Sequence, residues 1–302
     1  MVNPPVLHGL KRFIFSGLKC TIDKQILDKK IPREHRSEPM IENLFSMKGK
    51  VCVVTGGSSG LGRYMAQGFL EAGAERVYIT ARSKEKLQGT ATELTSIADG
   101  QCIGIDGDLS TLEGVNDLAK TLRDKESSID VLVNNAGLGL GSPIKTMSAD
   151  DWDRTMDINT RSPLFLTQAL LEPLKAKATL DDPSRVIFIS SVAASGVFPG
   201  VLAYSSSKKV LEHLTPQLAL ALTDDFIRVN AIAPGRFYSE MTRGAWKDPE
   251  AASFKAELER IPAHRYGDME DIAGVAVMLC SRAGAYFTGE VLNLDGGYRL
   301  RH

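Results

Sequence analysis

The chain lacks the features that mark several classes of protein. Its four cysteines include no C-x-x-C pair and its five histidines show no metal-ligand spacing, so we predict no metal site. No uninterrupted apolar run approaches the ~20 residues that a membrane helix needs, so no integral membrane segment is predicted. The formal net charge of −1 gives no electrostatic reason to expect nucleic acid or an anionic membrane as a partner.

The cysteines that are present indicate a reducing compartment. Cys52 and Cys102 lie inside apolar, strand-like runs, and we expect both to be buried, reduced thiols. We therefore expect a cytoplasmic protein, with mitochondrial targeting by the N-terminal arm as the alternative.

The first 45 or so residues differ in composition from the rest. Before Cys20 they contain basic residues but no acid, with leucine and isoleucine at roughly helical spacing. This pattern fits an amphipathic targeting or membrane-surface helix, or an extension that packs on the domain or on an oligomer partner. The return of acids at Asp23 and Asp28 favours the second interpretation. We therefore divide the chain into an N-terminal extension, residues 1–45, and one domain, residues 46–302.

From Lys50 onward, strand-like and helix-like segments alternate. Apolar, β-rich runs predict strands at residues 50–55, 76–80, 101–105, 129–133, 186–189, 227–232 and 290–294. Apolar residues at helical spacing predict helices at residues 61–71, 112–123, 163–176 and 203–222. This alternation predicts an α/β fold with a doubly wound parallel sheet, covered by helices on both faces.

The first predicted strand leads into a glycine-rich turn that opens a helix. Glycines permit a tight turn and a close approach of the backbone to a pyrophosphate. The helix N-terminus offers free N–H groups and the positive end of a dipole to that anion. The location between strand and helix therefore predicts a dinucleotide-binding site. The expected contacts in this loop are Gly56, Ser58, Ser59, Gly60, Leu61 and Gly62.

The end of the second predicted strand indicates which dinucleotide binds. An acid there would hold the ribose 2′-hydroxyl of NAD, whereas an arginine can pair with the 2′-phosphate of NADP. The chain has Arg82 at this point and no acid. We therefore predict NADP(H) as the cofactor; the alternative is an arginine that is merely solvated in a surface loop.

Tyr204 and Lys208 stand four residues apart in a predicted helix, so their side chains share one face. A free tyrosine ionises near pH ~10. We expect the neighbouring ammonium to pull the pKa of the phenol down toward the working range. Ser191 closes a strand-like run upstream and is well placed to hydrogen-bond a substrate oxygen, with Ser190 the lesser candidate.

These motifs, in this order, resemble the short-chain dehydrogenase/reductase family, of the NADP-preferring, single-domain type with a Rossmann fold. The resemblance runs from about Leu44 to the C-terminus. The catalytic tetrad of the family matches Asn159, Ser191, Tyr204 and Lys208. The resemblance further implies cofactor contacts, besides Tyr204 and Lys208, for Asp108, Leu109, Asn135, Ala136, Gly137, Pro234, Gly235, Phe237 and Ser239.

Two positions depart from the family pattern. Ser59 stands where many NADP-preferring members carry a second basic residue, and Ser239 stands where threonine is more usual. Recognition of the 2′-phosphate then depends on Arg82, helped by the hydroxyls of Ser58 or Ser59 and by Lys84.

The resemblance implies hydride transfer between a nicotinamide and a substrate carbonyl carbon. Tyr204 would donate the proton in reduction, and Ser191 would orient and polarise the carbonyl. Lys208 would hold the nicotinamide ribose, and Asn159 a water that links Lys208 to solvent. The leading expectation is NADPH-dependent reduction of a ketone or 3-oxoacyl compound to a secondary alcohol. The alternatives are an NAD(P)-dependent dehydrogenase that oxidises a secondary alcohol, and a non-catalytic NADP(H)-sensing scaffold.

Residues 238–265 are charged and rich in alanine and glutamate, and we expect an irregular segment. The matching region of the family is a mobile lid that determines the substrate. Arg236, Arg243 and Lys247 either meet an anionic substrate tail, such as a CoA or carrier-protein phosphate, or are solvated charges. The resemblance also implies a homodimer or homotetramer.

Overall fold

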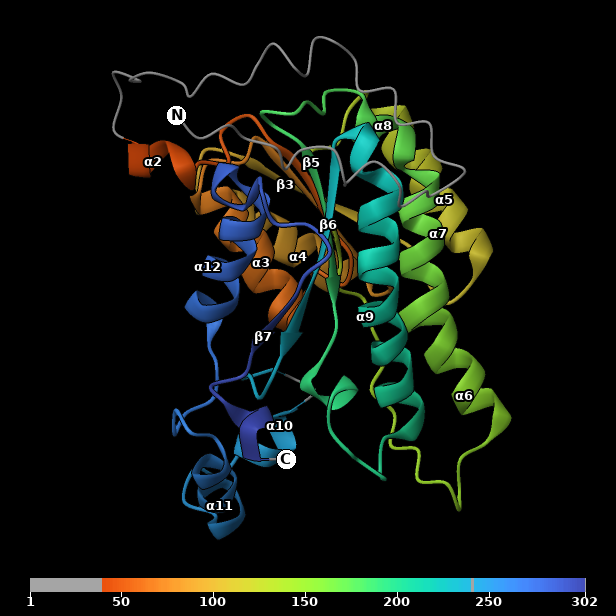
Figure 1. The fold of residues 1–302 in the computed structure, drawn as a ribbon, viewed down its shortest axis with the longest axis vertical. Helices are drawn as coiled ribbons and strands as arrows, with labels where there is room; N and C mark the ends of the chain where they lie inside the picture. Colours follow the sequence, from red (N-terminus) through yellow and green to blue (C-terminus); the bar gives the residue numbers. More distant parts are fainter. Residues whose placement is uncertain (1–39, 240–241, 302) are drawn as a thin grey trace, which may run out of the picture. The chain divides into compact units, whose positions relative to one another are not determined.

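The computed structural model describes residues 40–239 and 242–301 (Figure 1). The expectations for the N-terminal extension fall almost entirely on residues 1–39 and so lie outside the described residues. The described part of that segment is a short helix, α2 (Met40–Leu44). Within the described residues no helix is long and apolar enough to cross a membrane, and no group of three histidine, cysteine, aspartate or glutamate residues could hold a metal ion.

The core of the domain is a seven-stranded sheet in the order β3-β2-β1-β4-β5-β6-β7. Every neighbouring pair is parallel, which confirms the doubly wound α/β prediction. The strands are β1 (Val51–Val54), β2 (Arg76–Ala81), β3 (Gln101–Asp106), β4 (Val131–Asn134), β5 (Ser184–Ile189), β6 (Ile227–Pro234) and β7 (Val291–Leu294).

Helices cover both faces of this sheet (Figure 1). One face packs against α3 (Gly60–Glu71), α4 (Lys84–Thr95) and α12 (Met269–Cys280). The other packs against α5 (Leu112–Lys125), α7 (Ser162–Ala169), α8 (Leu171–Lys175) and α9 (Leu202–Leu222). The remaining helices are α6 (Ala149–Met156), α10 (Arg243–Trp246) and α11 (Ala252–Arg260).

Strand β1 shows why the predicted strands are continuously apolar. Val51 and Val53 belong to the core on one face, whereas Cys52 and Val54 belong to the core on the other. Side chains alternate along a strand, so a central parallel strand needs apolar residues at every position. The burial predicted for Cys52 and Cys102 is confirmed, and both are free thiols. Burial raises the pKa of Cys102 to about 12.

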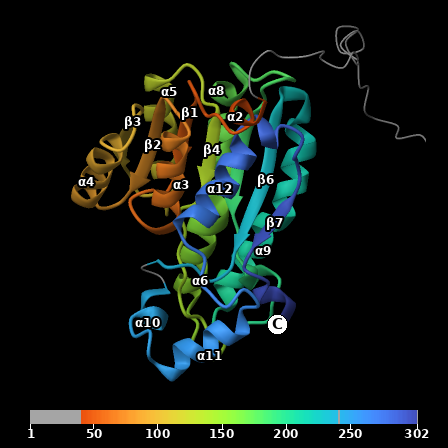
Figure 2. The same cartoon turned by 90° about the vertical axis from the view of Figure 1, so that its left-hand side faces the viewer.

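The structure corrects the predicted helices in two regions. The helix predicted at residues 163–176 is interrupted at Leu170, so that α7 and α8 are separate. Proline at position 173 lacks a backbone N–H and cannot continue the α7 hydrogen-bond pattern. The segment predicted to be irregular, residues 238–265, contains α10 and α11, which lie beyond the carboxyl ends of the strands (Figure 2).

The strand order positions the functional site. Strand β1 pairs with β2 on one side and with β4 on the other, so the connections run in opposite directions from β1. In open α/β sheets a crevice forms at the carboxyl ends of the strands where the order reverses, and ligands bind there.

Candidate active site

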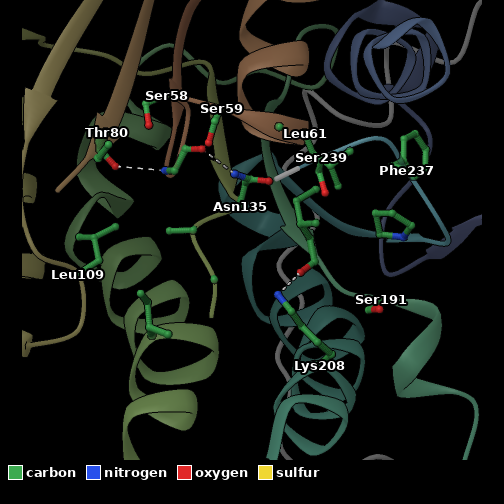
Figure 3. Close-up of a pocket in the computed structure, with 18 of the residues that line it drawn as sticks. Ser58, Ser59, Leu61, Thr80, Leu109, Asn135, Ser191, Lys208, Phe237 and Ser239 are labelled. Carbon is green, nitrogen blue, oxygen red and sulfur yellow. Dashed lines mark hydrogen bonds between the residues drawn. The ribbon is translucent and has the colours of Figure 1, made fainter. Parts of the chain in front are cut away.

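A cavity of about 820 Å³ opens at the carboxyl ends of the strands. Most of the predicted site residues line it (Figure 3). Those from the cofactor prediction are Gly56, Ser58, Ser59, Gly60, Leu61, Arg82, Leu109, Asn135, Ala136, Gly137, Pro234, Gly235, Phe237 and Ser239. The cavity is also lined by Ser191, Tyr204 and Lys208. One cavity therefore joins the glycine-rich loop to the Tyr-Lys pair.

The structure does not bring three predicted residues to the cavity wall. Gly62, Asp108 and Asn159 are not among its lining residues, and Asp108 lines a separate, smaller cavity. The Asp108 carboxylate accepts a hydrogen bond from the Ser110 amide at 2.9 Å, and this bond lowers the pKa of Asp108. Asp108 therefore shapes the loop after β3, while the neighbouring Leu109 faces the cavity.

Sequence reasoning missed several lining residues. They are Thr80, Ala81, Ser83, Gly107, Ile158, Ile189 and Thr242. Most of them stand at the ends of β2, β3 and β5 or just after them. Their position at a strand end was therefore the signal that could have found them.

The glycine-rich loop is shaped by close contacts with two strands. Gly56 has a φ of +67°, in the left-handed region. A Cβ on Gly57 would lie 2.6 Å from Cγ2 of Ile79, so only glycine fits against β2. The Gly57 amide donates to the carbonyl of Thr80 at 3.1 Å. The loop is thus held in place by protein contacts alone.

The helix after this loop offers free donors to the cavity. Ser59 is the N-cap residue of α3, and its hydroxyl makes no capping hydrogen bond to the helix. The first N–H groups of an α-helix have no partner within the helix, and they carry the positive end of the dipole. The start of α3 therefore fits an anionic group such as a pyrophosphate.

The ends of β1 and β4 are joined by a small polar network. Thr55 Oγ1 accepts hydrogen bonds from the amides of Asn135 and Ala136, both at 3.0 Å. The Asn135 side chain donates to the carbonyl of Thr55 at 2.8 Å and to that of Gly56 at 3.2 Å. Asn135 thereby ties the glycine-rich loop to β4 (Figure 3).

Gly62 gives a first testable prediction, because it lies where α3 meets this network. A Cβ at this position would lie 2.5 Å from both Asn135 Nδ2 and the carbonyl oxygen of Gly56. We expect Gly62→Ala to lower the free energy of unfolding by about 2 kcal/mol and to weaken NADPH binding. Urea denaturation and fluorescence titration measure the two effects.

The matched control is Gly89→Ala in α4, where an added Cβ meets nothing within 4 Å. An exposed helical glycine costs stability relative to alanine, so this variant should be slightly more stable than wild type. Equal behaviour of the two variants would show that the Gly62 contact has no special role.

Helix α9 presents the Tyr-Lys pair to the cavity. The Lys208 ammonium donates to the carbonyl of Ile189 at 2.7 Å (Figure 3). It lies 5.7 Å from the centroid of the Tyr204 ring. The predicted sharing of one helix face is therefore observed, and Lys208 is anchored to the end of β5.

The predicted effect of Lys208 on the phenol is wrong for this structure. Burial raises the pKa of Tyr204, opposed by a hydrogen bond with Ser191 and by the charge of Arg236. Burial also lowers the pKa of Lys208 to about 8. The physical reason is that both groups lose water at the cavity wall, and the ammonium bonds to the Ile189 carbonyl.

Asn159 lies behind Lys208 in a π-helical turn, Asp157–Arg161. Its side chain accepts from the Leu138 amide at 2.7 Å, and donates to the Leu138 carbonyl and to Ser207 Oγ, both at 2.9 Å. A Cβ on Gly137 would lie 3.2 Å from Asn159 Oδ1 and 3.4 Å from Lys208 Nζ. Asn159 and Lys208 thus flank the same glycine. Single π-helical turns are frequent at functional sites.

The loop after β6 covers one side of the cavity. Thr242 Oγ1 accepts from the Ser239 amide at 3.2 Å and donates to the Phe237 carbonyl. Thr242, three residues after Ser239, thus holds the loop through its hydroxyl. The family more usually has threonine at the position of Ser239.

The side chain of Arg236 bonds to the segment predicted to form the lid. Arg236 Nε lies 2.7 Å from Oε1 of Glu257, and the Tyr266 hydroxyl donates to the other carboxylate oxygen. The sequence left two alternatives for Arg236: a solvated charge, or a site for an anionic substrate tail. In the structure Arg236 instead forms this ion pair with Glu257. Because the pair joins α11 to the loop after β6, it ties the segment to the rim of the cavity.

Comparisons with known proteins agree with this arrangement. The model of the enoyl-(acyl carrier protein) reductase family matches residues 56–299. The chain is 43% identical over 257 residues to the rhamnolipids biosynthesis 3-oxoacyl-[acyl-carrier-protein] reductase of Pseudomonas aeruginosa, across 85% of this chain and 98% of that protein. It is 35% identical to the short-chain dehydrogenase/reductase PhomF of Diaporthe leptostromiformis, across 84% and 93%. This chain belongs to the short-chain dehydrogenase/reductase family.

Solved structures of short-chain dehydrogenases/reductases have the same fold. The RhlG/NADP active-site complex of Pseudomonas aeruginosa superimposes with a TM-score of 0.81 at 41% identity, across 85% of this chain and 99% of that chain. A gluconate 5-dehydrogenase from Burkholderia cenocepacia, in complex with NADP and tartrate, gives 0.77 at 27% identity, across 85% and 98%. The family assignment made from the motifs is therefore confirmed.

Proposed function

We infer that this chain is an NADP(H)-dependent oxidoreductase that reduces a ketone or 3-oxoacyl compound to a secondary alcohol. The observation that carries this conclusion is the single cavity that joins the glycine-rich loop to Ser191, Tyr204 and Lys208. Similarity to a 3-oxoacyl-[acyl-carrier-protein] reductase and to an NADP complex supports both the reaction and the cofactor.

The residues of the cavity fit a dinucleotide with an extra phosphate. The uncapped start of α3 suits the pyrophosphate. Arg82 lines the cavity at the end of β2, where a 2′-phosphate would lie. Within the described residues Arg82 forms no ion pair with an acid, so its guanidinium can meet that phosphate. When bound, the cofactor supplies the hydride.

We propose that Tyr204 is the proton donor. Reduction of a carbonyl needs a protonated acid beside the developing alkoxide. A phenol, whose ordinary pKa is about 10, carries its proton at neutral pH, and Tyr204 lines the cavity beside Ser191 and Lys208.

The neighbouring residues have distinct proposed roles. Ser191 stands where its hydroxyl can donate to the substrate oxygen while it accepts from the Ala193 amide at 3.2 Å. Lys208, fixed by the Ile189 carbonyl, would hold the nicotinamide ribose. Asn159 positions the loop after β4 and the start of α9 through its side-chain hydrogen bonds, and its place in a water relay is a proposal that rests on the family resemblance alone.

Similarity to a 3-oxoacyl-[acyl-carrier-protein] reductase favours a ketone or acyl substrate over a polyol. Oxidation of a secondary alcohol remains the second candidate, favoured by similarity to gluconate 5-dehydrogenases.

The proposed function is tested by cofactor choice in wild type and in Arg82→Ala. We expect wild type to prefer NADPH over NADH, and the variant to bind NADPH roughly tenfold more weakly, because a charge-assisted hydrogen bond to phosphate is lost. Fluorescence titration measures both affinities. Turnover is then assayed with acetoacetyl-CoA and with simple ketones.

The control is Lys86→Ala, which removes an exposed positive charge from α4 outside the cavity. Its NADPH affinity should equal that of wild type. Equal binding of NADH and NADPH, unchanged in Arg82→Ala, would contradict the NADP assignment. It would redirect the search toward NAD and secondary alcohols.

Further proposals concern the lid, the assembly and the compartment. We propose that residues 238–265 act as the substrate lid and that the protein assembles as a homodimer or homotetramer. Exposed apolar side chains on α9 and beside the edge strand β7 support this assembly; Leu220 is 83% exposed and Tyr286 is fully exposed.

We also propose the cytoplasm as the compartment, because Cys52, Cys102 and Cys280 are buried and reduced.

A further inference from the structure

Three residues on one face of α9 each meet one residue at the end of β5. Tyr204, Lys208 and Glu212 follow one another at intervals of four, so they stand one above the next. Their partners are three consecutive residues, Ile189 to Ser191. The first two contacts belong to the site described above. The third contact, made by Glu212, has no role in it.

The contact of Glu212 is with the hydroxyl of Ser190. Ser190 Oγ lies 3.1 Å from Oε1 of Glu212 and 3.2 Å from the carbonyl oxygen of Lys208. The hydroxyl has one proton to donate, and a carboxylate is the stronger acceptor. Ser190 is 2% exposed and lines the cavity, directly between Ile189 and Ser191.

Glu212 is unusually placed for a carboxylate. Its side chain is only 8% exposed, and its second oxygen accepts from the exposed Lys209 ammonium at 2.9 Å. Glutamate is rarely buried unless it is paired. The ion pair with Lys209 satisfies one oxygen on the solvent side, and Ser190 satisfies the other on the side of the cavity.

We propose that Glu212 is a positioning residue for the active site. Through Ser190 it fixes the end of β5 against α9. It thereby sets where Ser191 stands relative to Tyr204 and where the Ile189 carbonyl stands relative to Lys208. The proposal rests on the proposed function, because it concerns the geometry of that same reaction. A small misplacement of reacting groups lowers the rate strongly while binding is little changed.

The test compares Glu212→Ala, Glu212→Gln and the control Lys209→Met. We expect Glu212→Ala to lower kcat for NADPH-dependent ketone reduction by roughly tenfold or more, with KM for NADPH within about twofold. Glu212→Gln keeps an oxygen acceptor for Ser190 and should restore kcat to within about threefold. Lys209→Met removes only the ion pair and should match wild type.

A second pair of measurements separates positioning from mere stability. Ser190→Ala should lower kcat as Glu212→Ala does, and the double variant should fall no further, because both remove one contact. The melting temperature of each variant is recorded. A wild-type kcat in Glu212→Ala, or a Glu212→Gln variant as slow as Glu212→Ala, would overturn the proposal.

Hydrogen exchange followed by mass spectrometry tests whether Glu212 positions the end of β5 against α9, and it needs no measurement of turnover. Glu212→Ala should speed amide exchange in the segments that hold residues 189–191 and 204–208, and Lys209→Met should not. Unchanged or uniformly faster exchange would overturn the positioning role. A wild type that binds NADPH but turns over none of the carbonyl substrates would refute the proposed function, while the exchange result still decides the role of Glu212.

Discussion

Tyr204→Phe is expected to lower kcat for carbonyl reduction by roughly a thousandfold, within the range that a positioned general acid contributes. The variant loses only the phenolic oxygen, so the ring keeps its packing in the cavity wall. Lys208 also lines the cavity, but its ammonium is held by the Ile189 carbonyl, so we do not expect it to replace the phenol as the acid. Stopped-flow measurement of NADPH oxidation, with the substrate in excess, gives the comparison.

The affinity of Tyr204→Phe for NADPH should stay within about twofold of wild type, since the loop, Arg82 and Lys208 are untouched. Loss of turnover with intact binding assigns the proton transfer to Tyr204. A variant that retains a tenth or more of the wild-type kcat would show that another group or water donates the proton. The expected effect of the phenol on catalysis would then be wrong.

Lys208→Met should abolish most turnover yet make the cofactor-free protein more stable at pH 7. Burial lowers the pKa of Lys208 from 10.5 to about 8, which corresponds to about 3 kcal/mol. Methionine also gives up the hydrogen bond to the Ile189 carbonyl, which costs about 1 kcal/mol. We expect a net gain of about 2 kcal/mol in the free energy of unfolding.

The sign of the pH dependence follows from the depressed pKa of Lys208. Between the folded value of about 8 and the unfolded value of about 10.4, the unfolded chain binds more protons, so wild-type stability rises with pH. The free-energy cost of burying the charged Lys208 ammonium is complete below pH ~8 and vanishes above pH ~10.4. The advantage of Lys208→Met over wild type should therefore shrink across this window in urea denaturation.

Lys209→Met is the matched control for Lys208→Met, because it makes the same change one residue later on the same helix. The Lys209 side chain is 62% exposed, so its replacement should give no pH-dependent difference in stability. A Lys208→Met variant that is less stable than wild type at pH 7 would show that the anchor at Ile189 outweighs the cost of burying the charge.

The sequence predicted the sheet, and most of the residues that meet in one cavity, because both depend on local patterns. Runs such as Val51–Val54 are apolar at every position, as expected for a strand that is buried on both faces. The glycine-rich loop, the Tyr-Lys spacing and Ser191 likewise lie within short segments. Their meeting in one cavity follows from the rule that ligands bind at the carboxyl ends of parallel strands.

Features that depend on distant contacts could not be predicted. The pKa of Tyr204 depends on how far the fold removes water from the phenol, and sequence spacing gives no measure of that. The partner of Arg236 is Glu257, on a helix that the composition did not indicate. The contact of Glu212 with Ser190 likewise appears only when α9 is packed against β5.

The hydrogen bonds of Thr55 and Asn135 have a consequence for the thermodynamics of cofactor binding. These bonds join β1, β4 and the glycine-rich loop using groups of the protein alone. The glycine-rich loop and the ends of β1 and β4 are therefore preorganised, and the protein loses little conformational entropy when a dinucleotide binds. The difference in affinity between NADPH and NADH then reports the local interactions of one phosphate group, because the folding of the loop contributes equally to both.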